Sequence, residues 1–181
     1  MTGPDIAVAI ECDHWLSALP GVEDQCRRVA AIALASAVAA DDLDIPVDRC
    51  EISLVLADDA LVRGLNAQYR NQDKPTNVLS FAALDDEDAP ECEEGPLLLG
   101  DVIVAYETTA SEAVAEGKTI ANHLTHLVAH GVLHLLGYDH QEDDEAGEME
   151  GLERSILSAL GVPDPYMISE TNAAKEGDAR L

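Results

Sequence analysis

Residues 119–140 read TIANHLTHLVAHGVLHLLGYDH, and this stretch says more about the fold than any other part of the chain. Its apolar residues, at positions 120, 124, 127, 128, 132, 133, 135 and 136, cover most of the circumference of a helix over residues 119–136. A helix that is apolar on nearly every side is expected to be buried. Gly137 is expected to end it in a left-handed turn.

Three histidines of this stretch have the spacing of metal ligands. His130 and His134 are four residues apart, so they project from one face of the helix. Tyr138 and Asp139 then carry the chain back, so that His140 can reach the first two imidazoles. Three neutral imidazoles around an open fourth position are typical of a catalytic zinc site. We therefore predict one Zn²⁺ per chain, bound by these three histidines.

Two other histidines and one glycine limit this interpretation. His123 and His126 lie on the same helix and either extend its polar face towards the site or are partly exposed, so we do not count them as ligands. The spacing H-x-x-x-H-x-x-G-x-x-H also occurs in metzincin-type metalloproteases, which need a glutamate directly after the first histidine as general base. Gly131 occupies that position here, which argues against peptide hydrolysis by that mechanism.

Outward from this helix, the hydrophobic periodicity predicts an α+β fold. We expect strands at residues 6–10, 51–56, 77–81 and 97–105, and further helices at 23–40, 58–69, 108–116 and 142–160. Asp58 is the expected N-cap of the second of these helices. The sequence thus favours a single compact domain over residues 1–168, with a mixed four-stranded sheet packed with about five helices. The polar residues 169–181 are expected to form a disordered tail.

The loop between the last two strands is strongly acidic. Residues 85–94 hold seven acidic residues and Pro90, so we expect a solvated loop. Two strands joined by a loop of this length suggest an antiparallel pair.

The charge of the chain restricts its partners. Ten Lys and Arg against 36 Asp and Glu give a formal net charge of −26, which opposes non-specific binding to nucleic acid and to acidic membranes. A nucleic-acid role would need a local basic patch, a metal ion or a partner, and we expect no binding to DNA. Residues 61–81 are the most basic stretch, with Arg63, Arg70 and Lys74 against Asp73 alone. Such a stretch suits a phosphate-binding segment, although chance clustering of three cations is the alternative. Aromatic residues are only 3% of the chain, so we do not expect a broad platform for stacking bases.

Cysteine usage and hydropathy suggest a cellular compartment. Cys12, Cys26, Cys50 and Cys92 are widely spaced, as expected for reduced thiols. No signal peptide is evident, and the longest apolar run, at residues 29–40, is too short to span a bilayer. We therefore expect a soluble, cytoplasmic protein.

Three segments resemble the YbeY family of endoribonucleases. HGVLHLLGYDH at residues 130–140 carries the family's histidine motif, and YRNQDKPTNVLSF at 69–81 is similar to its Y-R-x-x-D-x-P-T-N-V-L-S-F segment. LGDVI at 99–103 is similar to its L-G-D-I-x-I strand, and the resemblance spans about residues 51–160.

The resemblance implies a metal-dependent endoribonuclease specific for single-stranded RNA. It implies a role in maturation of ribosomal RNA, at the 3′ end of the small-subunit rRNA, and in ribosome quality control. The small ribosomal subunit or its assembly factors are the implied partners. His130, His134 and His140 match the family's histidines, and Arg70 matches its functionally important arginine. We predict that Arg70 is catalytic and that Arg70 and Lys74 bind the substrate.

The residues suggest how such an enzyme would cleave a phosphodiester. Zn²⁺ can lower the pKa of bound water to about 7 and polarise a phosphoryl oxygen, and a bidentate Arg70 would stabilise the developing negative charge. Hydroxide on the metal, the 2′-hydroxyl of RNA and Asp139 could each fill the role of the missing base, and Asp139 is equally suited to orienting a ligand histidine. Two other functions stay open: a zinc hydrolase of another substrate, such as a metzincin-like protease, and a non-catalytic ribosome-assembly factor with a structural metal.

Overall fold

The computed structural model describes residues 3–83, 95–139 and 143–165. His140, the acidic loop at 85–94 and the tail at 169–181 lie outside the described residues. None of the described helices is long and apolar enough to cross a bilayer.

One mixed sheet of four strands organises the fold. The strands are β1 (Asp5–Ile10), β2 (Cys50–Ala57), β3 (Val78–Ala82) and β4 (Leu97–Ala105), arranged in the order β1-β2-β4-β3. β1 pairs with β2 and β2 with β4 in parallel, whereas β3 pairs with β4 in antiparallel fashion. The predicted mixed sheet and the predicted antiparallel pair are both confirmed. β3 therefore forms one edge of the sheet.

Six α-helices and one 3₁₀ turn surround the sheet in the described part of the chain. They are α1 (His14–Ala18), α2 (Val22–Ala40), the 3₁₀ turn η1 (Val47–Arg49), α3 (Asp59–Arg70), α4 (Tyr106–Glu116), α5 (Ile120–Leu135) and α6 (Asp143–Ala159). The five predicted helices are present, with ends that differ by one or two residues. α1 was not predicted, because five residues are too few to establish a helical period. Its Trp15 is fully buried and donates a hydrogen bond to the carbonyl of Ala57 at 2.9 Å.

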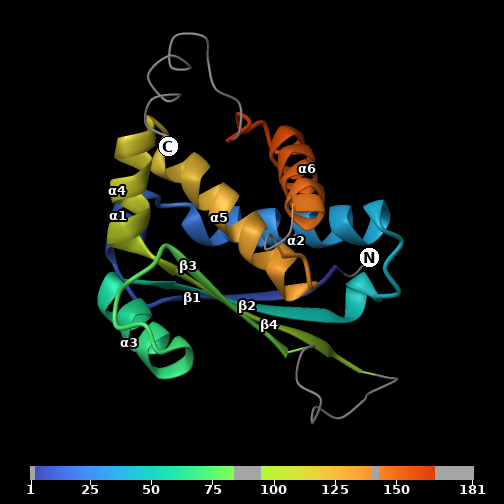
Figure 1. Cartoon of the computed structure of the whole chain (residues 1–181), viewed down its shortest axis with the longest axis horizontal. Coiled ribbons are helices and arrows are strands. Elements are labelled where there is room, and N and C mark those ends of the chain that lie inside the picture. Colours follow the sequence, from blue (N-terminus) through green and yellow to red (C-terminus); the bar gives the residue numbers. More distant parts are fainter. Residues whose placement is uncertain (1–2, 84–94, 140–142, 166–181) are drawn as a thin grey trace.

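The helices cover both faces of the sheet unequally. α2 and α5 pack on one face with α6 outside them, and α3 lies on the opposite face (Figure 1). The larger core lies under α2 and α5, and a smaller cluster that includes Val62 and Leu79 lies under α3. As predicted, α5 is buried on most of its surface, and Leu124, Val128 and Val132 are all inaccessible to solvent.

The ends of the helices follow local sequence signals. The Asp58 side chain accepts a hydrogen bond from the amide of Leu61 at 2.9 Å, which confirms the predicted N-cap of α3. Gly137 has φ of +97°, and the amide of Tyr138 beyond it donates to the carbonyl of Leu133 at 3.1 Å. This 6→1 bond closes the C-terminus of α5 in the left-handed turn that the glycine was expected to make.

Gly131 lets α5 approach the sheet closely. A Cβ atom on this residue would lie 2.6 Å from Cγ1 of Val102 on β4 and 3.2 Å from the hydroxyl of Ser80 on β3. The Ser80 hydroxyl also donates to the carbonyl of Gly131 at 3.1 Å. A side chain at position 131 would therefore push the helix away from the sheet.

We expect Gly131→Ala to lower the free energy of unfolding by about 1–2 kcal/mol. Overpacking typically costs ~1–3 kcal/mol, which exceeds the gain of up to ~1 kcal/mol from replacing a helical glycine. Gly64→Ala, at an exposed position of α3, is the matched control, since a Cβ there meets nothing within 4 Å. It should leave stability unchanged or raise it by up to ~1 kcal/mol. Urea unfolding followed by circular dichroism measures both, and equal shifts in the two variants would contradict the packing argument.

Candidate active site

A cleft of about 570 Å³ opens where α5 lies over the edge strand β3. It is lined by Arg70 at the end of α3, by Ser80 of β3, by His130 and His134 of α5, and by Asp139 beyond α5. Residues that are up to 69 positions apart in sequence thus share one surface depression. Of the predicted site residues, the fold brings Arg70, His130 and His134 together.

The two histidines of α5 meet through their ring nitrogens. Nε2 of His130 lies 2.9 Å from Nε2 of His134, with the ring centroids 4.5 Å apart and the planes nearly perpendicular. One turn of helix separates the two residues, which accounts for the contact. At this separation the two nitrogens can share a proton, or both can direct lone pairs at one cation.

A buried carboxylate from α6 determines which nitrogen of His130 is available. Glu153 is fully buried, and its Oε1 lies 2.5 Å from Nδ1 of His130 and 3.4 Å from Nε2 of His126. A carboxylate accepts the Nδ1–H proton, which leaves the lone pair of neutral His130 on Nε2, the atom that faces His134. A metal-binding histidine commonly donates its other N–H to a carboxylate in this way. The residues present therefore fit a metal ion bound by Nε2 atoms.

A second arrangement of possible ligands lies beside the first. His126, His130 and Glu153 each offer an atom within 4.8 Å of the other two, so these residues form a candidate metal site among the described residues. Two ligands of one tetrahedral zinc ion lie roughly 3.3 Å apart, given bonds of ~2.0–2.2 Å. The 2.5 Å between Glu153 and His130 is far shorter than that and favours a shared proton over a shared metal ion. The 2.9 Å between the Nε2 atoms of His130 and His134 is closer to the ligand separation and would have to widen only slightly around an ion.

Glu153 was missed by the sequence analysis, although the sequence carried a signal. On α6 it occupies the buried face together with Met149, Ile156 and Leu157, at helical spacing. Since an unpaired charge is costly to bury, a glutamate at a core position indicates a polar partner inside the protein.

The turn that leads from α5 towards His140 is tied to α2. The hydroxyl of Tyr138 donates to the carboxylate of Asp41, the residue that follows α2. Burial and this hydrogen bond raise the pKa of the Tyr138 phenol, which further favours the protonated form that donates to Asp41. The bond holds the start of the segment that carries the third predicted ligand.

Arg70 faces solvent and the cleft. Its Nη2 donates to the carbonyl of Ser80 at 2.9 Å, and its guanidinium carbon lies 5.5 Å from the ring centroid of Phe81. Within the described residues, no carboxylate lies within ion-pair distance of Arg70. The guanidinium therefore keeps donors available for an anionic ligand.

The other two cations of the basic segment have different surroundings. Arg63 pairs with Asp73 at 2.7 Å, and this contact lowers the pKa of the Asp73 carboxyl. Arg63 is thus neutralised locally. Lys74 lies in an adjoining depression of about 330 Å³, which shares Arg70 with the cleft. Of the basic segment, Arg70 and Lys74 are therefore the cations positioned for a ligand.

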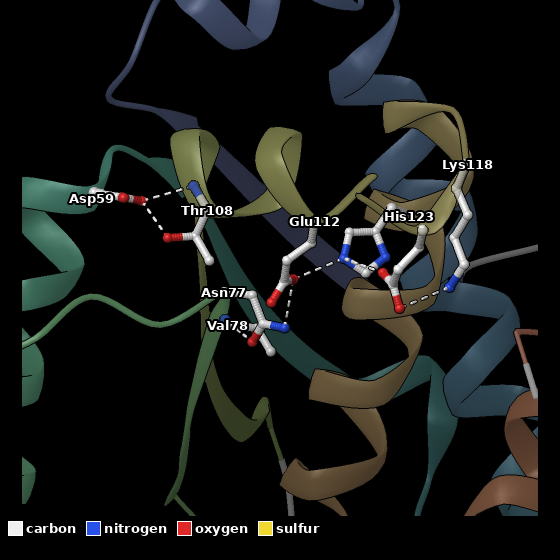
Figure 2. A network of polar contacts seen from close by, with 8 residues as sticks. Asp59, Asn77, Val78, Thr108, Glu112, Lys118 and His123 are labelled. Carbon is white, nitrogen blue, oxygen red and sulfur yellow. Dashed lines mark hydrogen bonds and ion pairs between the residues drawn. The ribbon is translucent and has the colours of Figure 1, made fainter. Parts of the chain in front are cut away.

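A separate hydrogen-bond network fixes Asn77, another residue that lines the cleft. Figure 2 shows Glu112 between Asn77 and His123: its Oε1 accepts from Nδ2 of Asn77 at 3.0 Å and lies 2.9 Å from Nε2 of His123. Asn77 also lines the cleft, and its own Oδ1 accepts from the amide of Val78. His123 thus contacts a carboxylate that supports the rim of the cleft.

Comparisons with known proteins agree with the motifs. The family model described as endoribonuclease YbeY matches residues 20–161. A relative from Paramagnetospirillum magneticum, named endoribonuclease YbeY, is 59% identical over 90% of this chain and 95% of its own length. A relative of the same name from Azorhizobium caulinodans is 52% identical over 91% of this chain and 97% of its own length.

A solution structure of a protein from Thermotoga maritima covers 90% of this chain and 99% of its own, with a TM-score of 0.49 and 19% identity, a likeness too distant to bear on the site. The family match over most of the chain, and relatives this similar over nine tenths of it, establish that the chain belongs to the endoribonuclease YbeY family.

Proposed function

We propose that the chain is a Zn²⁺-dependent endoribonuclease that cuts single-stranded RNA. The observation that carries the proposal is the cleft in which Arg70 faces the same space as His130 and His134. Family membership supports the reaction class. We further propose that its substrate is ribosomal RNA at the 3′ end of the small-subunit rRNA, that it meets this RNA on the small ribosomal subunit or its assembly factors, and that it works in the cytoplasm.

We assign the metal to Nε2 of His130 and His134, with His140 as the third ligand. The hydrogen bond from Nδ1 of His130 to Glu153 supports this assignment, because it leaves Nε2 as the basic nitrogen. When bound, the ion supplies positive charge to a phosphoryl oxygen and makes water more acidic.

The protein's own groups then act on the phosphate. Arg70 is held by the Ser80 carbonyl through one N–H, and its remaining donors bind the phosphate whose charge increases in the transition state. Lys74 in the adjoining depression binds a neighbouring phosphate of the same strand. For the proton transfer, Asp139 lines the cleft and is suited to accepting a proton or to orienting a ligand.

The other two functions are not supported. A metzincin-type base would have to occupy position 131, where a Cβ would point at Val102 and Ser80 of the sheet. The relatives are named as endoribonucleases, which supports neither a protease nor a non-catalytic assembly factor.

Protein purified without added metal should contain about one zinc ion per chain. His134→Ala should reduce this to nearly none, whereas His14→Ala, which removes an exposed helical histidine, should leave it unchanged. Glu153→Gln should lower zinc affinity by roughly 10–100-fold in a chelator competition, because the amide fixes the His130 tautomer less strongly. If instead His126→Ala removes the zinc and His134→Ala retains it, the ion is bound by His126, His130 and Glu153.

The protein should cut an unpaired RNA oligonucleotide and leave casein intact. A chelator should stop the cleavage, and added Zn²⁺ should restore it. The same RNA strand in a perfect duplex is the control and should be cut much more slowly. Chelator-sensitive hydrolysis of casein without RNA cleavage would refute the proposed function.

Arg70→Ala should keep the fold and the zinc but lose about 10²–10³ in cleavage rate, the scale for removing one preorganised donor. Arg70→Lys should recover little of this loss, since an ammonium cannot reproduce the planar fork of the guanidinium. Arg63→Ala is the matched control, because Arg63 is paired with Asp73. Full recovery by the lysine variant, together with loss of the effect at high salt, would mean that Arg70 only attracts RNA.

A further inference from the structure

One aromatic side chain stands on the surface next to Arg70. Tyr69 is 61% exposed, and of the aromatic residues in the described part of the chain it alone is exposed. The chain has only six aromatic residues, and this exposed tyrosine directly precedes Arg70 in sequence. A single exposed aromatic residue does not by itself indicate a site, so its contacts decide the matter.

Tyr69 is held in place by another aromatic ring. Its ring centroid lies 5.4 Å from that of Phe81, with an angle of 64° between the planes. Phe81 is the only phenylalanine of the chain and is partly buried on β3, against the small core under α3. The guanidinium of Arg70 lies over the same Phe81 ring at 5.5 Å. Tyr69 and Arg70, neighbours in sequence, are therefore both supported by Phe81.

Tyr69 and Phe81, the aromatic pair, lie on the opposite side of edge strand β3 from the cleft, and Arg70 connects the two sides. Ser80 and Ala82 line the cleft, whereas Phe81 between them faces α3 on the other side of β3. Because β3 is an edge strand, no further strand separates the two sides. Arg70 reaches around this edge, since it contacts Phe81 and also lines the cleft. Tyr69 therefore lies next to the place where a ligand bound by Arg70 would leave the cleft.

Because the chain is strongly acidic, an uncharged contact would help RNA to bind near Arg70. With a net charge of −26, the protein repels RNA at long range, and Arg63 is already paired with Asp73. Stacking of a base on an aromatic ring needs no charge and tolerates any base. It also needs a base whose faces are uncovered, which a single strand offers and a duplex does not.

We propose that Tyr69, supported by Phe81, is a stacking subsite for an unpaired nucleobase of the RNA strand whose phosphate Arg70 binds. The subsite rests on the proposed function and adds to it a reason for single-strand preference. It consists of two rings, so it stacks one base rather than a run of bases.

The test measures binding separately from cleavage. Full-length, metal-loaded protein is titrated with a fluorescent 2′-O-methyl oligonucleotide, recovered intact afterwards, and binding is followed by anisotropy. Tyr69→Ala should weaken binding by roughly 5–100-fold, the range for loss of one base–aromatic stack, and Tyr69→Phe should bind like the wild type. Leu61→Ala, which truncates an exposed apolar side chain on the same helix, is the matched control and should have no effect.

Two further measurements distinguish stacking from charge. The Tyr69→Ala defect should persist when salt is raised, and it should vanish with an abasic oligonucleotide, which retains the phosphates. Trp15 is fully buried, so the fluorescence of a Tyr69→Trp variant should report quenching by a stacked base. Equal binding by wild type and Tyr69→Ala, or an equal defect with the abasic strand, would overturn the subsite. If the wild type still cuts RNA in that case, the proposed function stands and the subsite alone is wrong.

Discussion

The close contact between α5 and the edge of the sheet is the constraint on which the site depends. It exists because residue 131 has no side chain, which lets the helix come against Val102 and Ser80. The two residues that flank this contact on the helix surface, His130 and His134, are thereby placed over β3, and β3 connects them to Arg70 through the Ser80 carbonyl. A wider helix–sheet distance would separate the imidazoles from the guanidinium. The same glycine that distinguishes this motif from a metzincin motif is thus a packing requirement of this fold.

Glu153 shows how the core takes part in the chemistry of the cleft. Burying a carboxylate costs several kcal/mol, and here the cost is offset by the contacts to His130 and His126. The contact with His130 also has a specific effect, because the carboxylate selects one tautomer of the imidazole. α6 packs against α5 and does not line the cleft among its described residues, yet through Glu153 it orients a histidine that does.

The surroundings of the individual cations differ as well. The protein is strongly acidic, yet Arg70 has no described carboxylate within ion-pair distance, while Arg63 nearby is neutralised. Local positive charge in a negative field concentrates attraction at one place on the surface. An anionic ligand is therefore attracted more strongly at the cleft, where Arg70 keeps donors available, than at the acidic surface around it.

Local sequence patterns account for most of the helices and strands and for the spacing of two cleft histidines, but not for α1 or for Glu153. The periods of α2, α5 and the four strands, the caps at Asp58 and Gly137, and the spacing of His130 and His134 are local properties, because each depends on residues a few positions apart. Which distant groups meet depends instead on how the helices and strands pack together. Glu153 reaches His130 across 23 positions, Arg70 contacts the Ser80 carbonyl across a strand edge, and Tyr69 and Phe81 pair on the far side of that edge. The order of strands in the sheet and the depth at which α5 packs set these contacts, and neither is encoded in the spacing of any one segment.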